Sequence, residues 1–243
     1  MPITTKPVEY KDGKTTCVGF LAWDESVASA RPCVLINHAW GGRDDFADGK
    51  AVEMAAMGYV GFALDNYGGG ATPDTTEDKQ AMMSPLVDDR KMLLKRLKAG
   101  YAAASALPEV DESHMAAMGF CFGGLCTLDM ARGGMELMAA VSFHGLLGGH
   151  TLPNKKTGAS VLIAHGWDDP LAPPSDVEAV MDELSKAGAD VQLLAFSNTM
   201  HAFTVPDADA PKDGLQYNKT NARRAWMQAL ELLDEKFRMH GVG

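Results

Sequence analysis

Three residues of the kinds used in nucleophilic catalysis follow one another along the chain, in the order cysteine, aspartate, histidine. The first is Cys121, at the centre of the segment GFCFG. This segment has the spacing of the G-x-S-x-G nucleophile elbow, a sharp turn from a strand into a helix, with sulfur in place of oxygen. We predict that Cys121 is a nucleophile at a helix start, where the partial positive charge favours a thiolate. The alternative is a small buried cysteine beside glycines that let a helix pass closely.

The acid is expected in the segment HGWDD, which follows a strand later in the chain. Its His-Gly-x-x-Asp spacing, from His165 and Gly166 to Asp169, favours Asp169 over the adjacent Asp168. An acid at this place fits the chain order of the α/β-hydrolases, in which nucleophile, acid and histidine follow one another. The alternative is an aspartate that only caps a turn before the next helix.

The base is expected at His201, in the short loop between the last strand and the last helix. A lone histidine is more often a core or surface residue, but this one has the chain position that the base requires. Three other histidines lack that position: His38, His144 and His165. The imidazole would take and return the thiol proton, and the carboxylate would fix the tautomer of the imidazole.

Two backbone N–H groups are expected to hold the oxyanion. Phe122 directly follows the predicted nucleophile, so its N–H faces the place where the oxyanion forms. The second donor should come from the loop after an early strand, and Trp40 in the segment HAWGG is the candidate.

The elements that must position these residues are short apolar strands that alternate with longer helix-like stretches. Predicted strands cover residues 16–22, 33–37, 59–65, 115–120, 139–143, 161–165 and 191–196, and predicted helices cover 46–57, 79–103, 124–132, 175–187 and 217–238. This alternation predicts an α/β fold with a mostly parallel sheet of about seven or eight strands and helices on both faces. Loops beyond the carboxyl ends of such strands carry the chemistry. We expect a single domain over residues 1–243, without a large cap.

The composition narrows the choice of partners. The chain has 243 residues with 22 Lys+Arg against 32 Asp+Glu, a formal net charge of −10. A surface this acidic repels phosphate backbones and anionic lipids, so we expect neither nucleic acid nor a membrane as partner. The N-terminus does not read as a secretory signal, and four cysteines do not suggest a disulfide scaffold. We expect a cytoplasmic protein that acts on a small molecule as a monomer or small homo-oligomer.

With these residues considered, the chain resembles the dienelactone hydrolase family, cysteine hydrolases of the α/β-hydrolase fold. The resemblance runs from about residue 18 to the last helix, and is carried by INHAWGGRDDF, YVGFALDNYGGG, AAMGFCFGGLC, VSFHG, VLIAHGWDDPLAPP and MHAFTVPDAD. It implies a cofactor-free hydrolase of a small carboxylic ester or lactone, similar to carboxymethylenebutenolidase, that forms a thioester intermediate. It implies that Cys121 is the nucleophile, Asp169 the acid and His201 the base. It also implies that the backbone N–H groups of Phe122 and Trp40 are the oxyanion donors.

Two positions differ from the family pattern. Members commonly have a glutamate after the histidine of the first loop, where this chain has Ala39. Members that cleave dienelactone have an arginine four residues past the catalytic histidine, where this chain has Val205, and Thr204 is no substitute. The named substrate of the family is therefore not the expected one. Because a nearby carboxylate opposes thiolate formation, its absence at Ala39 predicts a standing thiolate–imidazolium pair between Cys121 and His201.

The substrate pocket is expected to be lined by residues of the strand-end loops: His38, Trp40, Tyr67, Trp167 and Phe203. Their rings favour an apolar or aromatic acyl group. Two other functions stay open. One is a metal hydrolase built from the histidines with Asp168 or Asp169, although no HExxH or paired Cys/His spacing supports a metal. The other is a catalytically impaired thiol-sensing or ligand-binding protein on the same fold.

Overall fold

The structure is a computed structural model that describes residues 2–150, 152–153 and 155–238. The chain forms two compact units, Met1–Met118 (unit 1) and Gly119–Gly243 (unit 2). The cysteine, aspartate and histidine expected to act together all belong to unit 2, while the loops that contain Trp40 and Tyr67 belong to unit 1. The expected single domain over residues 1–243 stays a prediction.

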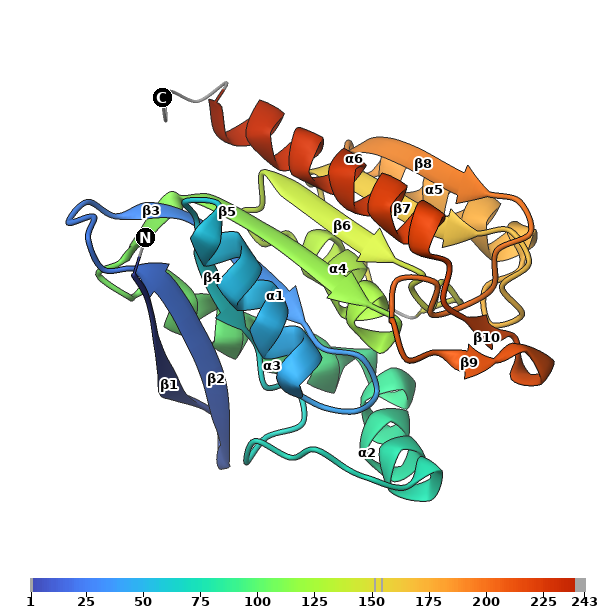
Figure 1. The fold of residues 1–243 in the computed structure, drawn as a ribbon, viewed down its shortest axis with the longest axis horizontal. Helices are drawn as coiled ribbons and strands as arrows, with labels where there is room; N and C mark the ends of the chain where they lie inside the picture. Colours follow the sequence, from blue (N-terminus) through green and yellow to red (C-terminus); the bar gives the residue numbers. More distant parts are fainter. Residues whose placement is uncertain (1, 151, 154, 239–243) are drawn as a thin grey trace. The chain divides into compact units, whose positions relative to one another are not determined.

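Unit 1 contains β1 (Ile3–Asp12), β2 (Thr15–Asp24), β3 (Arg31–Asn37), α1 (Asp45–Ala56), β4 (Val60–Ala63), α2 (Thr76–Asp88) and α3 (Arg90–Ser105), and β5 (Val110–Phe120) begins in it. β3 and β4 pair in parallel, whereas β2 pairs antiparallel with both β1 and β4. Figure 1 shows α1 on one face of these strands and α3 on the other. Because both faces are covered, β4 is buried at every residue and reads as an apolar run.

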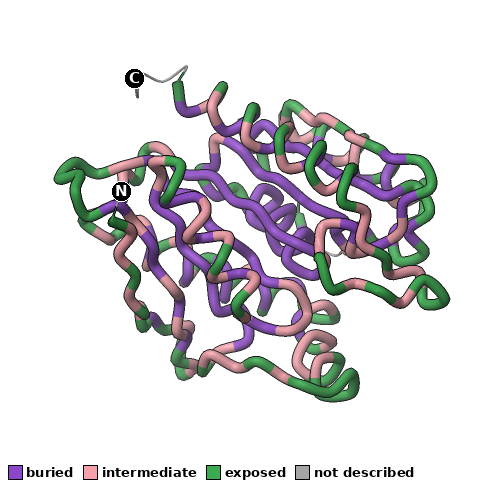
Figure 2. Tube along the Cα trace, viewed as in Figure 1, coloured by how far each residue is buried: buried purple, intermediate pink, exposed green. Residues whose placement is uncertain are grey.

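Unit 2 contains the end of β5, α4 (Phe122–Arg132), β6 (Ala139–Phe143), β7 (Ser160–Gly166), α5 (Pro174–Lys186), β8 (Asp190–Phe196), β9 (Asp209–Ala210), the 3₁₀ turn η1 (Pro211–Asp213), β10 (Leu215–Gln216) and α6 (Lys219–Arg238). β7 pairs in parallel with β6 and β8. In Figure 1, α6 lies in front of these strands, and α4 and α5 lie behind them. All residues of β6 and β7 are buried, as the purple trace of Figure 2 shows.

The strand order is β1-β2-β4-β3-β5-β6-β7-β8 in one eight-stranded sheet. This confirms the predicted α/β-hydrolase fold with a mostly parallel sheet of seven or eight strands. Between β6 and β7 the described residues include no helix or strand, in agreement with the expected lack of a large cap.

Two predicted features of unit 1 were wrong. The strand β1 was missed, because its residues alternate between exposed and half-buried and include Lys6 and Pro7. The helix expected over residues 79–103 is two helices, which meet at Asp89. The carboxylate of Asp89 accepts the N–H groups of Lys91 and Met92, at 3.1 and 2.9 Å, and so caps the second helix.

Candidate active site

Cys121 lies on a strained turn between β5 and α4. Its backbone has φ 55° and ψ −117°, a region that a residue with a Cβ rarely adopts. The turn needs glycine on both sides, because a Cβ at Gly119 would lie 2.0 Å from the carbonyl oxygen of Gly123. A Cβ at Gly124 would lie 2.5 Å from Oγ of Ser142, so α4 can approach β6 only with glycine there. The first contact explains the first glycine of the GFCFG spacing, and the second explains the glycine that directly follows this segment.

Hydrogen bonds hold both the N–H and the carbonyl of Cys121. Its N–H donates to the carbonyl of Phe143, at the end of β6, over 3.1 Å. Its carbonyl accepts the N–H groups of Gly124 at 2.9 Å and Leu146 at 3.3 Å. Phe122, the predicted oxyanion donor, is the first residue of α4. An N–H in the first turn of a helix has no carbonyl four residues before it inside the helix, and the helix dipole favours negative charge there.

Asp169 and His201 are joined by a buried hydrogen bond. Nδ1 of His201 lies 2.7 Å from Oδ2 of Asp169, and the two side chains are 1% and 0% exposed. The second carboxylate oxygen accepts the N–H of Leu171 at 2.8 Å. The neighbouring Asp168 is exposed, and its N–H donates to the carbonyl of Thr199. The contact with the histidine is therefore made by Asp169 and not by Asp168.

The loops that carry this pair pack closely against each other. A Cβ at Gly166 would lie 2.5 Å from the carbonyl oxygen of Thr199, so the loops after β7 and β8 can meet only with glycine at this position. The backbone of His201 is held as well, since its N–H donates to Gly214 at 2.9 Å and its carbonyl accepts the N–H of Gln216 at 3.1 Å. The glycine of the His-Gly-x-x-Asp pattern thus has a steric role, which is to let the acid reach the histidine.

The charges around His201 favour its protonated form. Burial acts to lower the pKa of this imidazole, but the charge of the Cys121 thiolate and the hydrogen bond to Asp169 outweigh burial and raise the pKa to about 10. Nε2 of His201 is buried and has no hydrogen-bond partner among the residues that the structure describes. Because Cys121 and Asp169 both act to raise the pKa of His201, the sulfur and the carboxylate both lie near this ring. The arrangement brings together a thiol, an imidazole and a carboxylate in the order that nucleophilic catalysis uses.

Two further buried histidines surround His201. The ring of His144 lies 5.1 Å from the ring of His201, centroid to centroid, and Nε2 of His144 is 2.7 Å from Oγ1 of Thr204. His165 is 1% exposed, and neither of its ring nitrogens has a hydrogen-bond partner. Burial lowers the pKa of both side chains, to well below the ordinary value for His144, so both are neutral. Sequence reasoning set His144 aside for its chain position. The signal that could have found it is its place directly after β6, the strand whose last carbonyl binds the elbow.

Three predicted pocket residues lie together in unit 1, at the carboxyl ends of β3 and β4. Nε2 of His38 accepts the N–H of Asn66 at 3.1 Å, and the hydroxyl of Tyr67 donates to the carbonyl of Trp40 at 2.9 Å. The rings of His38 and Tyr67 are 4.7 Å apart. These contacts join the loop after β3 to the loop after β4. The roles of Trp40 as second oxyanion donor and of Ala39 in the charge of Cys121 stay predictions, since both residues belong to unit 1.

The two predicted pocket residues of unit 2 differ from each other. Trp167 is 44% exposed and lies beside His165, with ring centroids 6.0 Å apart, so it is open to a ligand. Phe203 is fully buried and packs against Phe196 and His144. Its burial does not support a lining role, and its packing supports the loop that carries His201.

The loop after β4 is organised by Asp65, a fully buried carboxylate of unit 1. It accepts the N–H groups of Val18 at 2.9 Å, Gly68 at 2.7 Å and Gly70 at 2.8 Å. The guanidinium of Arg96 donates to the carbonyl of Tyr67 at 2.9 Å. The segment Gly68–Gly70, in which all three glycines have positive φ, is thereby folded around one carboxylate.

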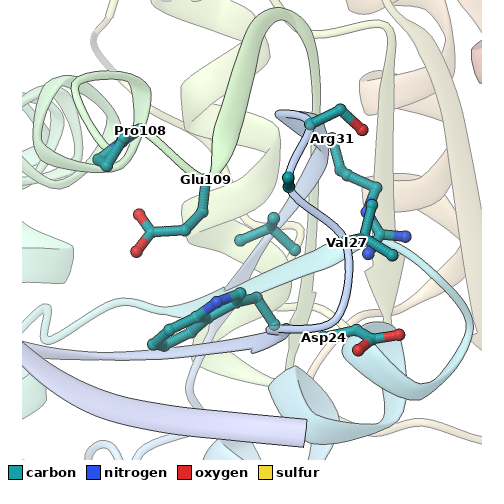
Figure 3. Close-up of a pocket in the computed structure, with 9 residues that line it drawn as sticks. Asp24, Val27, Arg31, Pro108 and Glu109 are labelled. Atoms are coloured by element: carbon teal, nitrogen blue, oxygen red, sulfur yellow. The ribbon is translucent and has the colours of Figure 1, made fainter. Parts of the chain in front are cut away.

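A cavity of about 170 Å³ lies in unit 1, at the end of β2 and the start of β3 (Figure 3). Trp23, Val27 and Glu109 are among its lining residues, and it contains no cysteine or histidine. Among the residues that the structure describes, no group of three or more His, Cys, Asp or Glu side chains is arranged to hold a metal ion. No helix in the described part of the chain is long and apolar enough to cross a membrane.

Comparison with known proteins gives the same fold. The family model for the dienelactone hydrolase family matches residues 18–237. A solved structure described as a dienelactone hydrolase-like promiscuous phosphotriesterase from metagenomic libraries is 36% identical, with a TM-score of 0.93 over 98% of this chain and 100% of that one. Another solved structure, m3DLH, is 35% identical, with a TM-score of 0.92 over 97% of this chain and 99% of that one.

A relative from Caenorhabditis elegans, an uncharacterized protein, is 34% identical over 157 residues, which are 63% of this chain and 99% of the relative. The family match spans both units and includes the elbow, the acid loop and the histidine loop. The eight-stranded sheet, the strained cysteine turn and these matches lead to one assignment: the chain belongs to the dienelactone hydrolase family of hydrolases.

Proposed function

We propose that this protein hydrolyses a small carboxylic ester or lactone, with Cys121 as nucleophile, His201 as base and Asp169 as the acid that orients the imidazole. The observation that carries the proposal is the buried 2.7 Å hydrogen bond between Asp169 and His201, on an imidazole whose pKa the Cys121 thiolate helps to raise. A histidine held in this way is fixed in one tautomer, with Nε2 directed at the sulfur.

The reaction follows from these positions. The Cys121 thiolate attacks the ester carbonyl, and the N–H of Phe122 at the start of α4 stabilises the oxyanion. The protonated His201 gives its proton to the leaving alcohol as the C–O bond breaks, which leaves a thioester on Cys121. His201 then takes a proton from water, the hydroxide attacks the thioester, and the acid and the thiolate are released. Trp40 as the second oxyanion donor remains part of the sequence prediction.

The substrate class rests on the family and on the loops of unit 2. The loops after β7 and β8 contain the exposed Trp167 and Leu171 and the acidic Asp168, and no lysine or arginine between residues 166 and 171 or between 197 and 205. An anionic acyl group finds no lysine or arginine there, whereas a neutral apolar group finds exposed apolar surface. We therefore propose a neutral ester or lactone.

The test is turnover of p-nitrophenyl butyrate and of simple lactones by the wild type, Cys121→Ala and Cys126→Ala. Cys126 is a fully buried cysteine of the same helix and serves as the matched control. Removal of the nucleophile should lower kcat by about 10⁴-fold or more, and Cys126→Ala should keep most of the activity. A rapidly quenched reaction should contain one acyl group on the peptide with Cys121, found by mass spectrometry. Activity of Cys121→Ala near the wild-type rate would contradict the assignment.

Phosphotriesters are a second substrate class to test, because the solved structure described as a promiscuous phosphotriesterase is 36% identical over 98% of this chain. Turnover of a p-nitrophenyl dialkyl phosphate that is lost in Cys121→Ala would place that activity at the same thiolate. If the wild type cleaves neither class while iodoacetamide still labels Cys121 rapidly, the thiol-sensing or ligand-binding alternative replaces hydrolysis.

A further inference from the structure

His144 has a backbone conformation that calls for an explanation. It directly follows β6, is fully buried, and has φ +38°, a region that few residues other than glycine adopt. Its N–H donates to the carbonyl of Ala164 in β7 over 2.8 Å, which fixes the residue relative to that strand. Strain of this kind persists where the surrounding structure imposes it, and it gathers at functional sites.

The ring of His144 is enclosed on several sides. Its centroid lies 5.1 Å from that of His201, with the two planes at 70°, and 5.4 Å from that of Phe203, at 75°. Nε2 lies 2.7 Å from Oγ1 of Thr204, and Nδ1 is buried without a hydrogen-bond partner. The ring therefore packs on the imidazole of the proposed base, and its Nε2 makes a polar contact with Thr204.

This contact determines where the proton of His144 lies. A neutral imidazole carries one N–H, and a buried N–H without an acceptor is rarer in proteins than an acceptor without a donor. A proton on Nε2 is donated to the Thr204 hydroxyl, and Nδ1 is left as a lone pair. Thr204 thus fixes both the tautomer and the orientation of the ring. It lies three residues after His201, so the same loop carries the base and the hydroxyl that anchors the neighbour of the base.

We propose that His144 and Thr204 are positioning residues for His201: the neutral ring of His144, anchored by the Thr204 hydroxyl, holds the imidazolium of His201 in line with Cys121. Asp169 fixes one end of the base, but a ring held at one nitrogen can still rock about that bond. The His144 ring limits this motion, because its centroid lies 5.1 Å from that of His201. The inference rests on the proposed function, because it assigns His201 as base.

Every titratable group that acts on His201 is consistent with this role. Asp169, after β7, and Cys121, at the start of α4, favour its cation. His144 and His165, at the ends of β6 and β7, are neutral, because burial and the charge of His201 lower the pKa of each. A contact with its own backbone acts to raise the pKa of His144, and Asp169 acts to raise that of His165, but burial outweighs both. Neutral neighbours let the imidazolium persist, whereas a second cation at either position would oppose it.

The experiment compares Thr204→Val, which keeps the shape and loses the hydroxyl, with Thr204→Ser, which keeps the hydroxyl. Thr157→Val, at a buried threonine before β7 that accepts only the N–H of Ala159, is the matched control. We expect Thr204→Val to lower kcat for p-nitrophenyl butyrate by about 5- to 20-fold with KM within twofold. We also expect it to move the alkaline limb of the kcat/KM profile to lower pH, because the imidazolium has lost support. Thr204→Ser should keep kcat and the alkaline limb of the kcat/KM profile close to those of the wild type.

A second readout does not depend on turnover. The rate of iodoacetamide labelling of Cys121 against pH reports the thiolate–imidazolium pair directly, and Thr204→Val should shift this profile while Thr157→Val should not. Equal profiles for the wild type and Thr204→Val, or an equal loss at every pH together with a lower Tm, would overturn the proposal in favour of a structural contact. A shifted labelling profile in a protein that cleaves no ester would keep the positioning role and reject hydrolysis.

Discussion

Each unit buries an aspartate within three residues of the end of an inner strand, but the two carboxylates have different partners. Asp65, after β4, accepts three backbone N–H groups, from Val18, Gly68 and Gly70. Asp169, after β7, gives one oxygen to the N–H of Leu171 and the other to the imidazole of His201. A carboxylate whose lone pairs are taken by the backbone organises a loop. A carboxylate that keeps one oxygen for a titratable ring orients a group that can exchange protons.

The polar groups around the two carboxylates also differ in their hydrogen-bond partners. Near Asp65, the hydroxyl of Tyr10 and the guanidinium of Arg96 bond to backbone carbonyls of the same loop. Around Asp169, buried nitrogens of His144, His165 and His201 have no hydrogen-bond partner. Buried polar groups without partners are costly and uncommon in folded proteins. A buried oxygen near Asp65, Oδ1 of Asn66, also has no hydrogen-bond partner among the described residues. The difference is that the atoms without partners around Asp169 are imidazole nitrogens, which can exchange protons.

The largest effect should come from Asp169→Asn. An amide in place of the carboxylate no longer holds the tautomer that directs Nε2 of His201 to the sulfur, and in an enzyme with a similar triad this change lowers kcat by about 10⁴-fold. We expect a comparable loss of kcat for p-nitrophenyl butyrate, with a Tm close to that of the wild type. If kcat falls by less than tenfold, Asp169 is a structural residue like Asp65 and does not orient a catalytic imidazole.

Asp65→Asn should have the opposite effect: it should lower the Tm and leave kcat much less affected. The amide nitrogen cannot accept a hydrogen bond, so at least one of the three backbone N–H groups loses its partner, at a cost of about 1–3 kcal/mol for each. For a chain of this size, a shift of about 2–4 °C in Tm is expected for each kcal/mol. Urea denaturation and calorimetry measure the loss. Asp65→Asn should reduce kcat far less than Asp169→Asn does, and a Tm equal to the wild-type value would break the comparison.

The smallest effect concerns pH and stability. The pKa of His201 is raised from 6.5 to about 10 in the folded protein, so its contribution to the free energy of unfolding is complete below pH 6.5 and is lost as the pH rises toward 10. Cys121→Ala removes the thiolate, the first of the influences that raise this pKa. Between pH 8 and pH 10, urea unfolding should therefore show a steeper loss for the wild type than for Cys121→Ala. Parallel curves would contradict a charged pair at this site.

The sequence allowed the inner strands and the order of the site residues to be predicted, because both depend on local patterns. Buried strands read as apolar runs, and the GFCFG and HGWDD segments each contain a glycine that the fold needs there, Gly119 and Gly166. The exposed strand β1 had no such signal, since only Tyr10 among its residues is buried. The break at Asp89 had a signal, an aspartate that caps the next two N–H groups, but the apolar pattern on both sides concealed it.

The site was predicted less completely than the fold. Cys121, Asp169 and His201 could be found because each follows a strand at its carboxyl end. His144 also follows a strand, but its importance depends on ring packing against His201 and on a hydroxyl sixty residues away in sequence, which no spacing rule contains. The burial of Phe203 likewise depends on tertiary packing with Phe196 and His144.

The positive φ angles of Cys121 and His144 have a consequence for protein engineering. A screen that selects only for thermal tolerance favours residues that relax backbone strain, such as glycine or asparagine, and residues that remove unpaired buried polar groups. Both kinds of gain are available at His144, and the first is available at Cys121. Heat-selected libraries of this chain should therefore accumulate inactive but robust variants at these two positions, unless every round also selects for turnover.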